Sequence, residues 1–119
     1  MSKIRNPLLD NARLLLKRTS QKSGAKIWLK ASKTLSKSIS RKPKVNVGKI
    51  DQLTNKDSIV LIPGKVLGGG TVSHKIIIGA YSFTKSAEIK IQNAGGKALL
   101  IPEFLEEYST KKDVMLIGG

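Results

Sequence analysis

The sequence predicts one compact α/β domain that carries a basic, two-helix segment at its N-terminus. After residue 44, short runs of β-branched and aliphatic residues alternate with helical patterns, as is typical of α/β proteins. Before that point, the chain shows two amphipathic helical patterns and many lysines. A chain of 119 residues can bury one modest core, and 39% hydrophobic residues is a globular composition. We therefore expect a basic helical segment, residues 1–44, packed on an α/β core, residues 45–119.

The N-terminal segment should contain two helices. Asn6 is a good N-cap residue and Pro7 suits the first helical position, so the first helix should begin there and end near Gln21. The second helix should cover about residues 25–38. Its apolar face consists of residues at helical spacing: Ile27, Trp28, Ala31, Leu35 and Ile39.

The core should begin after a breaker at residues 41–44. Extended runs predict strands at residues 45–47, 58–62, 75–81, 97–101 and 114–117. Helical patterns lie between them at residues 48–53, 84–93 and 102–108. Thr84 can cap the second of these helices, and Gly95-Gly96 can stop it. The strand at 58–62 should end at Pro63-Gly64.

The charge is strongly basic and unevenly distributed. The chain has 22 Lys and Arg against 8 Asp and Glu, a net charge of +14. Residues 1–60 hold 15 basic and 3 acidic side chains, whereas residues 61–119 hold 7 and 5. No carboxylate occurs between Asp10 and Asp51. An ordinary solvated surface mixes both signs, so this composition predicts an external polyanion, best supplied by a nucleic-acid backbone.

Four lysines form a narrow stripe on the second predicted helix. Lys26, Lys30, Lys33 and Lys37 are spaced by four, three and four residues, beside the apolar face. Serines such as Ser32 are interspersed with them, and small hydroxyls can also donate to phosphates. We interpret the stripe as a phosphate-binding surface; the alternative is a solvated face of good helix formers.

Residues 63–75 form a glycine-rich stretch between two predicted strands. It matches neither the P-loop nor the dinucleotide-binding fingerprint. Its backbone amides could approach a phosphate closely, or it could simply be a flexible connection. If the first interpretation holds, Gly69→Val or Gly70→Val should impair assembly with a partner more than folding.

Nothing in the sequence indicates catalysis. His74 is the single histidine and cysteine is absent, so no metal site is expected. No acidic residue lies within ten positions of His74, and the carboxylates show no paired acid/base spacing. No apolar run approaches a membrane span, so we expect a soluble, intracellular protein. A membrane-surface protein and a nucleotide-dependent enzyme remain the weaker alternatives.

Several ordered motifs resemble those of the large-subunit ribosomal protein eighteen-e family of archaea and eukaryotes. They are Asn6-Pro7, SGAKIW at 23–28, VNVGKI at 45–50, PGKVLGGG at 63–70, His74-Lys75, AYSFT at 80–84 and AGG at 94–96. The second half also looks like that of the related bacterial large-subunit protein fifteen. The short length resembles archaeal members.

The resemblance implies irregular strand-strand-helix repeats in one α/β domain and a basic N-terminal segment that lies against 23S-type ribosomal RNA. It implies neighbouring ribosomal proteins as partners, a cytoplasmic ribosomal location, and no enzyme activity, cofactor, membrane or small-molecule substrate. The family's start region corresponds to Arg5, Asn6, Lys26 and Trp28. The expected RNA-binding residues of the N-terminal segment are Arg5, Asn6, Arg13, Lys17, Arg18, Lys22, Lys26, Lys30, Lys33, Lys37, Arg41, Lys42 and Lys44. Those around the glycine-rich stretch are Lys65, Gly68, Gly69, Gly70, His74 and Lys75.

Overall fold

The computed structural model of the chain describes residues 14–19, 21, 26–35, 43–108 and 113–117. Residues 14–19 are helical. The elements that follow are α2 (Lys26–Leu35), β1 (Lys44–Asn46), α3 (Val47–Leu53), β2 (Ser58–Leu67), β3 (Ile76–Phe83), α4 (Lys85–Asn93), β4 (Lys97–Leu100), α5 (Ile101–Tyr108) and β5 (Val114–Leu116). The predicted α/β class is confirmed. The strand-strand-helix order occurs at β2, β3 and α4, while helices connect the other successive strands.

The strands form one sheet in the order β1-β2-β3-β4, with β5 also paired to β2. Every pairing is parallel. β2 is long enough to have two partners along the edge that does not face β3. Its residues 59–61 pair with β5, and its residues 65–67 pair with β1.

β2 does not end at Pro63-Gly64, and that prediction was wrong. The strand continues to Leu67, with a register irregularity against β3 between Ile62 and Lys65. An irregularity of this kind tolerates a proline, which cannot donate to the ladder. The chain before β1 stabilises the second half of β2, since the amide of Lys65 donates to the Pro43 carbonyl at 3.0 Å. A Cβ on Gly64 would lie about 2.1 Å from that carbonyl, so glycine permits this approach.

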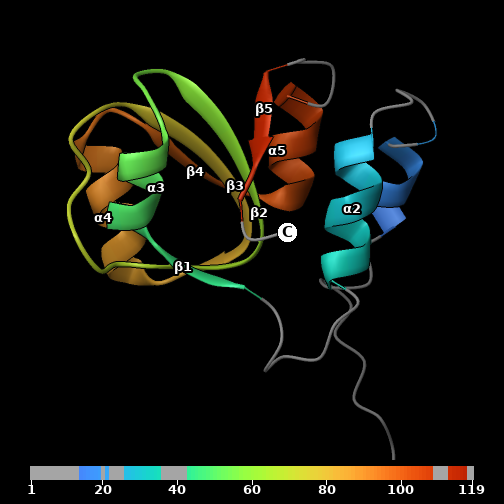
Figure 1. Cartoon of the computed structure of the whole chain (residues 1–119), viewed down its shortest axis with the longest axis horizontal. Coiled ribbons are helices and arrows are strands. Elements are labelled where there is room, and N and C mark those ends of the chain that lie inside the picture. Colours follow the sequence, from blue (N-terminus) through green and yellow to red (C-terminus); the bar gives the residue numbers. More distant parts are fainter. Residues whose placement is uncertain (1–13, 20, 22–25, 36–42, 109–112, 118–119) are drawn as a thin grey trace, which may run out of the picture.

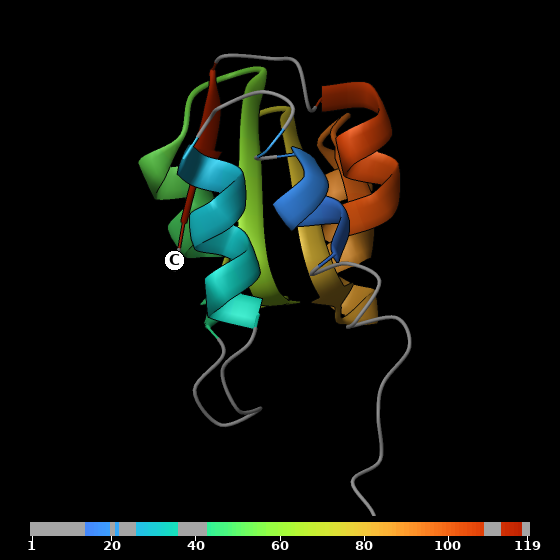
Figure 2. The same cartoon turned by 90° about the vertical axis from the view of Figure 1, so that its right-hand side faces the viewer.

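The sheet separates two helical layers, each with its own apolar core. α3 and α4 cover one face, and α5, α2 and residues 14–19 cover the other (Figures 1 and 2). The first core contains alternate residues of the central strands, including Val60, Ile62, Ile76 and Ile78. The second contains Leu61 and Ile77 from the opposite sheet face, with Leu16, Trp28, Ala31 and Phe104 from the helices. Parallel strands buried on both faces explain the continuous apolar runs in the sequence.

Both predicted ends of α4 are confirmed. Thr84 caps α4 by accepting a hydrogen bond from the Ala87 amide at 3.3 Å. At the other end, Gly95 has φ of +85°, and the amides of Gly95 and Gly96 donate to the carbonyls of Gln92 and Ile91. This pattern satisfies two carbonyls that the helix leaves unpaired. Val47 was expected in an extended piece but begins α3 instead.

Candidate nucleic-acid interface

α2 presents lysines to solvent and an aromatic residue to the core. Trp28 is 1% exposed and meets Phe104 of α5 edge-on, with ring centroids 6.4 Å apart. Ala31, three residues later, is also buried. Lys30 and Lys33 are exposed, as the predicted stripe requires. Burial of one face therefore fixes the orientation in which the helix displays these two lysines.

The buried face of α2 also includes two hydroxyl residues. Ser32 and Thr34 are 9% and 3% exposed. Thr34 donates its hydroxyl to the Lys30 carbonyl at 3.0 Å, which satisfies that polar group within the helix. Ser32 is largely buried as well, so its hydroxyl offers little surface to an external phosphate.

Two further predicted lysines lie side by side on adjacent strands. Lys44 of β1 and Lys65 of β2 are register partners, and both are exposed. Their neighbours Val45 and Val66 point into the first core, so the two lysines project from the opposite face. Like charges directly opposite each other on neighbouring strands destabilise a sheet unless a counter-charge is present. This pair of ammonium groups is suited to bind an anion.

The glycine-rich loop, residues 68–75, packs against the end of β1 and the start of α3. The Gly69 amide donates to Asn46 Oδ1 at 3.0 Å, and the Gly69 carbonyl accepts from the Gly48 amide at 2.9 Å. Gly70 has φ of +88°, and a Cβ on it would lie about 2.7 Å from Gly48 Cα. These glycines therefore permit a close approach between two segments of the protein's own backbone, the loop and the start of α3.

Lys90 of α4 anchors the same loop from the other side. Its ammonium group donates to the carbonyls of Gly68 and Gly70, at 2.7 and 2.6 Å. The loop returns from β2 to β3 without a helix, which is unusual for a parallel crossover. Lys90 and the half-buried Val72, which packs on the first core, hold it against the domain. Sequence reasoning missed Asn46 and Lys90, because both act on residues at least 20 positions away.

His74 is engaged within the fold through both ring nitrogens. Nδ1 lies 3.0 Å from Asp51 Oδ1, and Nε2 lies 2.9 Å from Thr54 Oγ1. The sequence suggested no carboxylate near His74, but α3 brings one from 23 positions away. Asp51 also accepts from the Ser73 amide at 2.9 Å and from the Ser73 hydroxyl. The Ser73 amide is the main cause that lowers the pKa of Asp51, and the Ser73 hydroxyl and His74 contribute.

This Asp51–His74–Thr54 arrangement cannot act as a catalytic triad. A triad nucleophile gives its proton to the histidine. Thr54 instead donates its hydroxyl to the Ile50 carbonyl at 2.7 Å, and only 8% of the residue is exposed. The three side chains fix the end of the glycine-rich loop on α3.

The predicted RNA-binding residues other than the glycines and His74 fall into three groups. Lys17, Arg18, Lys30, Lys33, Lys44 and Lys65 are exposed. Lys75 lies 3.6 Å from Asp57, so its charge is partly compensated at the surface. The remaining predictions fall outside the described residues or on a side chain that is not described: Arg5, Asn6, Arg13, Lys22, Lys26, Lys37, Arg41 and Lys42.

In the part of the chain that the structure describes, no group of three or more His, Cys, Asp or Glu side chains could hold a metal ion. Within the same residues, no helix combines the length and apolar character needed to span a membrane.

The structure is an α/β protein with exposed lysines on α2, β1 and β2, and the comparisons with known proteins identify its family. The family model for the ribosomal proteins 50S-L15, 50S-L18e and 60S-L27a matches residues 25–99. The chain therefore belongs to this family of ribosomal proteins and is not an enzyme. The family that the sequence motifs indicated is confirmed.

Three archaeal relatives share the name large ribosomal subunit protein eL18. The chain is 35% identical to large ribosomal subunit protein eL18 of Methanothermobacter thermautotrophicus, over 94% of this chain and 93% of that protein. It is 38% identical to eL18 of Sulfurisphaera tokodaii, over 78% and 79% of the two chains. With eL18 of Methanococcus maripaludis the identity is 38% over 86% and 85%.

Proposed function

We propose that the chain is a structural protein of the large ribosomal subunit in the cytoplasm, where it binds 23S-type ribosomal RNA and supports subunit assembly and translation. RNA binding would use the basic N-terminal segment, the lysines next to it, and the surface around the glycine-rich loop. The family and the names of the eL18 relatives support the ribosomal role. The RNA contacts are supported by the distribution of charge.

The observation that carries the RNA-binding proposal is the register pair Lys44–Lys65. Both ammonium groups are exposed on one face of two adjacent strands. The two like charges repel each other when they approach closely, and an anion bound between the two groups would relieve that repulsion. A phosphate backbone supplies such anions at regular intervals. The exposed lysines of α2 extend the same type of surface on a second element.

The proposal is tested by the salt dependence of binding to transcribed large-subunit ribosomal RNA. The double variant Lys44→Gln/Lys65→Gln removes two charges and retains most of each side chain. If each lysine neutralises one phosphate, the slope of log K against log[salt] should become shallower by roughly 1.4–1.8. The folded protein should be as stable as before or slightly more stable.

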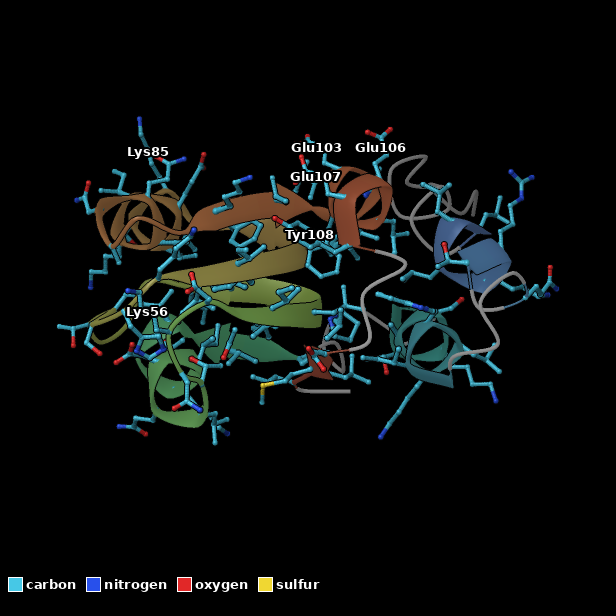
Figure 3. All side chains as sticks on the ribbon, turned by 90° about the horizontal axis from the view of Figure 1, so that it is seen from above. Lys56, Lys85, Glu103, Glu106, Glu107 and Tyr108 are labelled. Carbon is cyan, nitrogen blue, oxygen red and sulfur yellow. The ribbon has the colours of Figure 1, made fainter. Side chains whose placement is uncertain are left out.

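A matched control is Lys56→Gln/Lys85→Gln, which removes the same charge from two exposed lysines that are not among the predicted RNA-binding residues. Figure 3 shows both at the end of the molecule away from α2. The control should leave the salt slope nearly unchanged. Equal slopes for the two double variants would mean that only net charge matters, and the assigned lysines would not form the RNA site.

A further inference from the structure

One side of this basic protein is acidic. Glu103, Glu106 and Glu107 project together from the outer side of α5 (Figure 3), and Glu88 is exposed on α4. Three lysines lie near these carboxylates in the sequence. Lys90 donates to carbonyls of the glycine-rich loop, Lys97 lies 3.7 Å from Glu107, and Lys85 is exposed on the same side (Figure 3). The four glutamates outnumber Lys85 and Lys97, so this side carries local negative charge in a chain of net charge +14.

A groove of about 690 Å³ lies within the acidic side. Its floor is formed by Tyr81, Ser82 and Phe83 of β3 and by Ala98 and Leu100 of β4. Leu100 is 44% exposed, which is unusual for a leucine in a strand of this sheet. The groove thus offers apolar surface that the described part of the chain leaves partly open to solvent.

Carboxylates line the groove from both faces of the sheet. Glu88 comes from α4, which packs on the first core, and Glu103 comes from α5, which packs on the second. The two helices lie on opposite faces of the sheet (Figure 1). A partner in the groove would therefore have a negative charge on each side and apolar side chains beneath it.

The groove lies where the outermost strand of the sheet stops. Pairing of β4 with β3 ends at Leu100 and Ala80, while β3 continues to Phe83. Ser82 and Phe83 pair with β2 on their other edge. β4 has β3 as its only partner among the described strands. A segment in extended conformation can follow such an edge, with main-chain hydrogen bonds for affinity and alternate side chains in the groove.

We propose that this groove binds a basic, extended segment of another protein, with an apolar side chain over Leu100 and Phe83 and cationic side chains beside Glu88 and Glu103. Charge complementarity selects this occupant. Phosphates of RNA would be repelled by both carboxylates, whereas lysine or arginine would be attracted. The proposal rests on the proposed ribosomal role only in that the particle would supply the partner.

The affinity test uses the full-length chain, freed of nucleic acid, and a fluorescent peptide of alternating lysine and valine. A cationic peptide should avoid a protein of net charge +14 unless a local acidic site holds it. Binding is measured by anisotropy at low salt. The double variant Glu88→Gln/Glu103→Gln should weaken binding roughly 2- to 30-fold, as expected for two surface charge pairs. Leu100→Ser should weaken binding as well, without any change of charge.

The matched control is Asp57→Asn/Asp113→Asn, which makes the same change in net charge with two exposed residues that neither line the groove nor belong to the glutamates of the acidic side. It should change the dissociation constant less than twofold. If both double variants weaken binding equally, or if the peptide does not bind the unaltered chain, the groove is not a site for basic segments.

A second experiment examines the assembled particle. A photoreactive benzophenone residue replaces Leu100 in purified large subunits, and the cross-linked product is identified by mass spectrometry. The expected product is a segment of a second protein with net positive charge. The same substitution at Leu53, 51% exposed on α3, controls for general proximity. A cross-link from position 100 to RNA, or to no protein at all, overturns the proposal. The ribosomal role itself is judged by whether the chain is present in the particles, so the two failures are distinguishable.

Discussion

At the residue scale, the glycine-rich loop packs against the start of α3 so closely that side chains at the contact would not fit. Gly48 and Gly70 bring the start of α3 and the loop together, and the Gly69 amide donates to Asn46. Nothing local in the sequence predicts these contacts, since the partners lie more than 20 positions apart. The Thr84 cap of α4, by contrast, was predictable because its partner is three residues away. Local hydrogen bonds can be inferred from sequence, whereas those made by the tertiary fold cannot.

We expect Gly70→Ala to destabilise the protein by roughly 1–3 kcal/mol. The new Cβ would meet Gly48 backbone atoms at 2.7 Å, and φ at Gly70 is +88°. This expectation replaces the sequence-based one, in which substitution in the loop affects assembly more than folding. The measurement is the free energy of unfolding in urea.

The variant Gly95→Ala separates the strain of the left-handed backbone conformation from the close contact with Gly48. Gly95 has a similar φ of +85°, but an added Cβ there would meet nothing within 4 Å. It should therefore cost only the strain of the left-handed conformation, about 1 kcal/mol. If Gly95→Ala is as destabilising as Gly70→Ala, the contact with Gly48 contributes nothing.

The Asp51 carboxylate should make stability depend on pH in the acid range. Its folded-state pKa is below the ordinary value of 3.8, chiefly because the Ser73 amide donates to it. A lowered pKa means that its contribution is fully present above about pH 4 and is lost as the pH falls through the folded-state pKa. Asp51→Asn should therefore lower the unfolding free energy at pH 7 and flatten its decline below pH 4.

Unfolding of the Asp51→Asn variant is compared with that of Asp57→Asn at pH 7, 5, 4 and 3. Asp57 is exposed, and asparagine tolerates its φ of +66°. The control should stay within about 0.5 kcal/mol of the unaltered protein at pH 7. If the unfolding free energies of Asp51→Asn and of the unaltered protein decline in parallel as the pH falls, the hydrogen bonds from Ser73 to Asp51 do not make stability depend on pH.

At the scale of elements, helical periodicity was the most informative sequence feature. It placed Trp28 and Ala31 inward and Lys30 and Lys33 outward on α2. It did not reveal that Thr34 is buried, because a threonine that bonds its own helix backbone can enter a core. The extension of β2 past Pro63 was also hidden, since it depends on the neighbouring strand β1. Elements whose own residues show a clear periodic pattern could be predicted, whereas features that depend on neighbouring elements could not.

We expect the basic face of α2 to make a sequence-independent, salt-sensitive contribution to RNA binding. In the quadruple variant Lys26→Gln/Lys30→Gln/Lys33→Gln/Lys37→Gln, helix propensity is retained and four charges are lost. If all four lysines face phosphates, the salt slope should become shallower by roughly 3. Folded stability should change little or rise, because like charges at helical spacing are removed. An unaltered slope would mean that these lysines only face solvent.

At the scale of the whole molecule, charge is distributed unevenly over the protein. Residues 1–60 carry most of the excess positive charge, while the carboxylates of α4 and α5 lie within residues 61–119. The sequence could predict the charge imbalance, because charge can be counted. It could not predict that the acidic residues Glu88 and Glu103 line one groove from opposite faces of the sheet, since only the fold brings α4 and α5 to the same edge.

This asymmetry predicts how the chain should behave in cell extracts. It should sediment with the large subunit in low salt and be released by concentrated salt or by ribonuclease, whereas a non-ionic detergent should have no effect. A protein that neutralises about six phosphates loses roughly 10³-fold in affinity between 50 and 200 mM salt. Sucrose-gradient fractions probed for the chain at several salt concentrations measure this directly. The quadruple lysine variant should leave the particles at lower salt than the unaltered protein, while Lys56→Gln/Lys85→Gln should not. If the chain remains in the soluble fraction while other large-subunit proteins sediment, the ribosomal role is wrong.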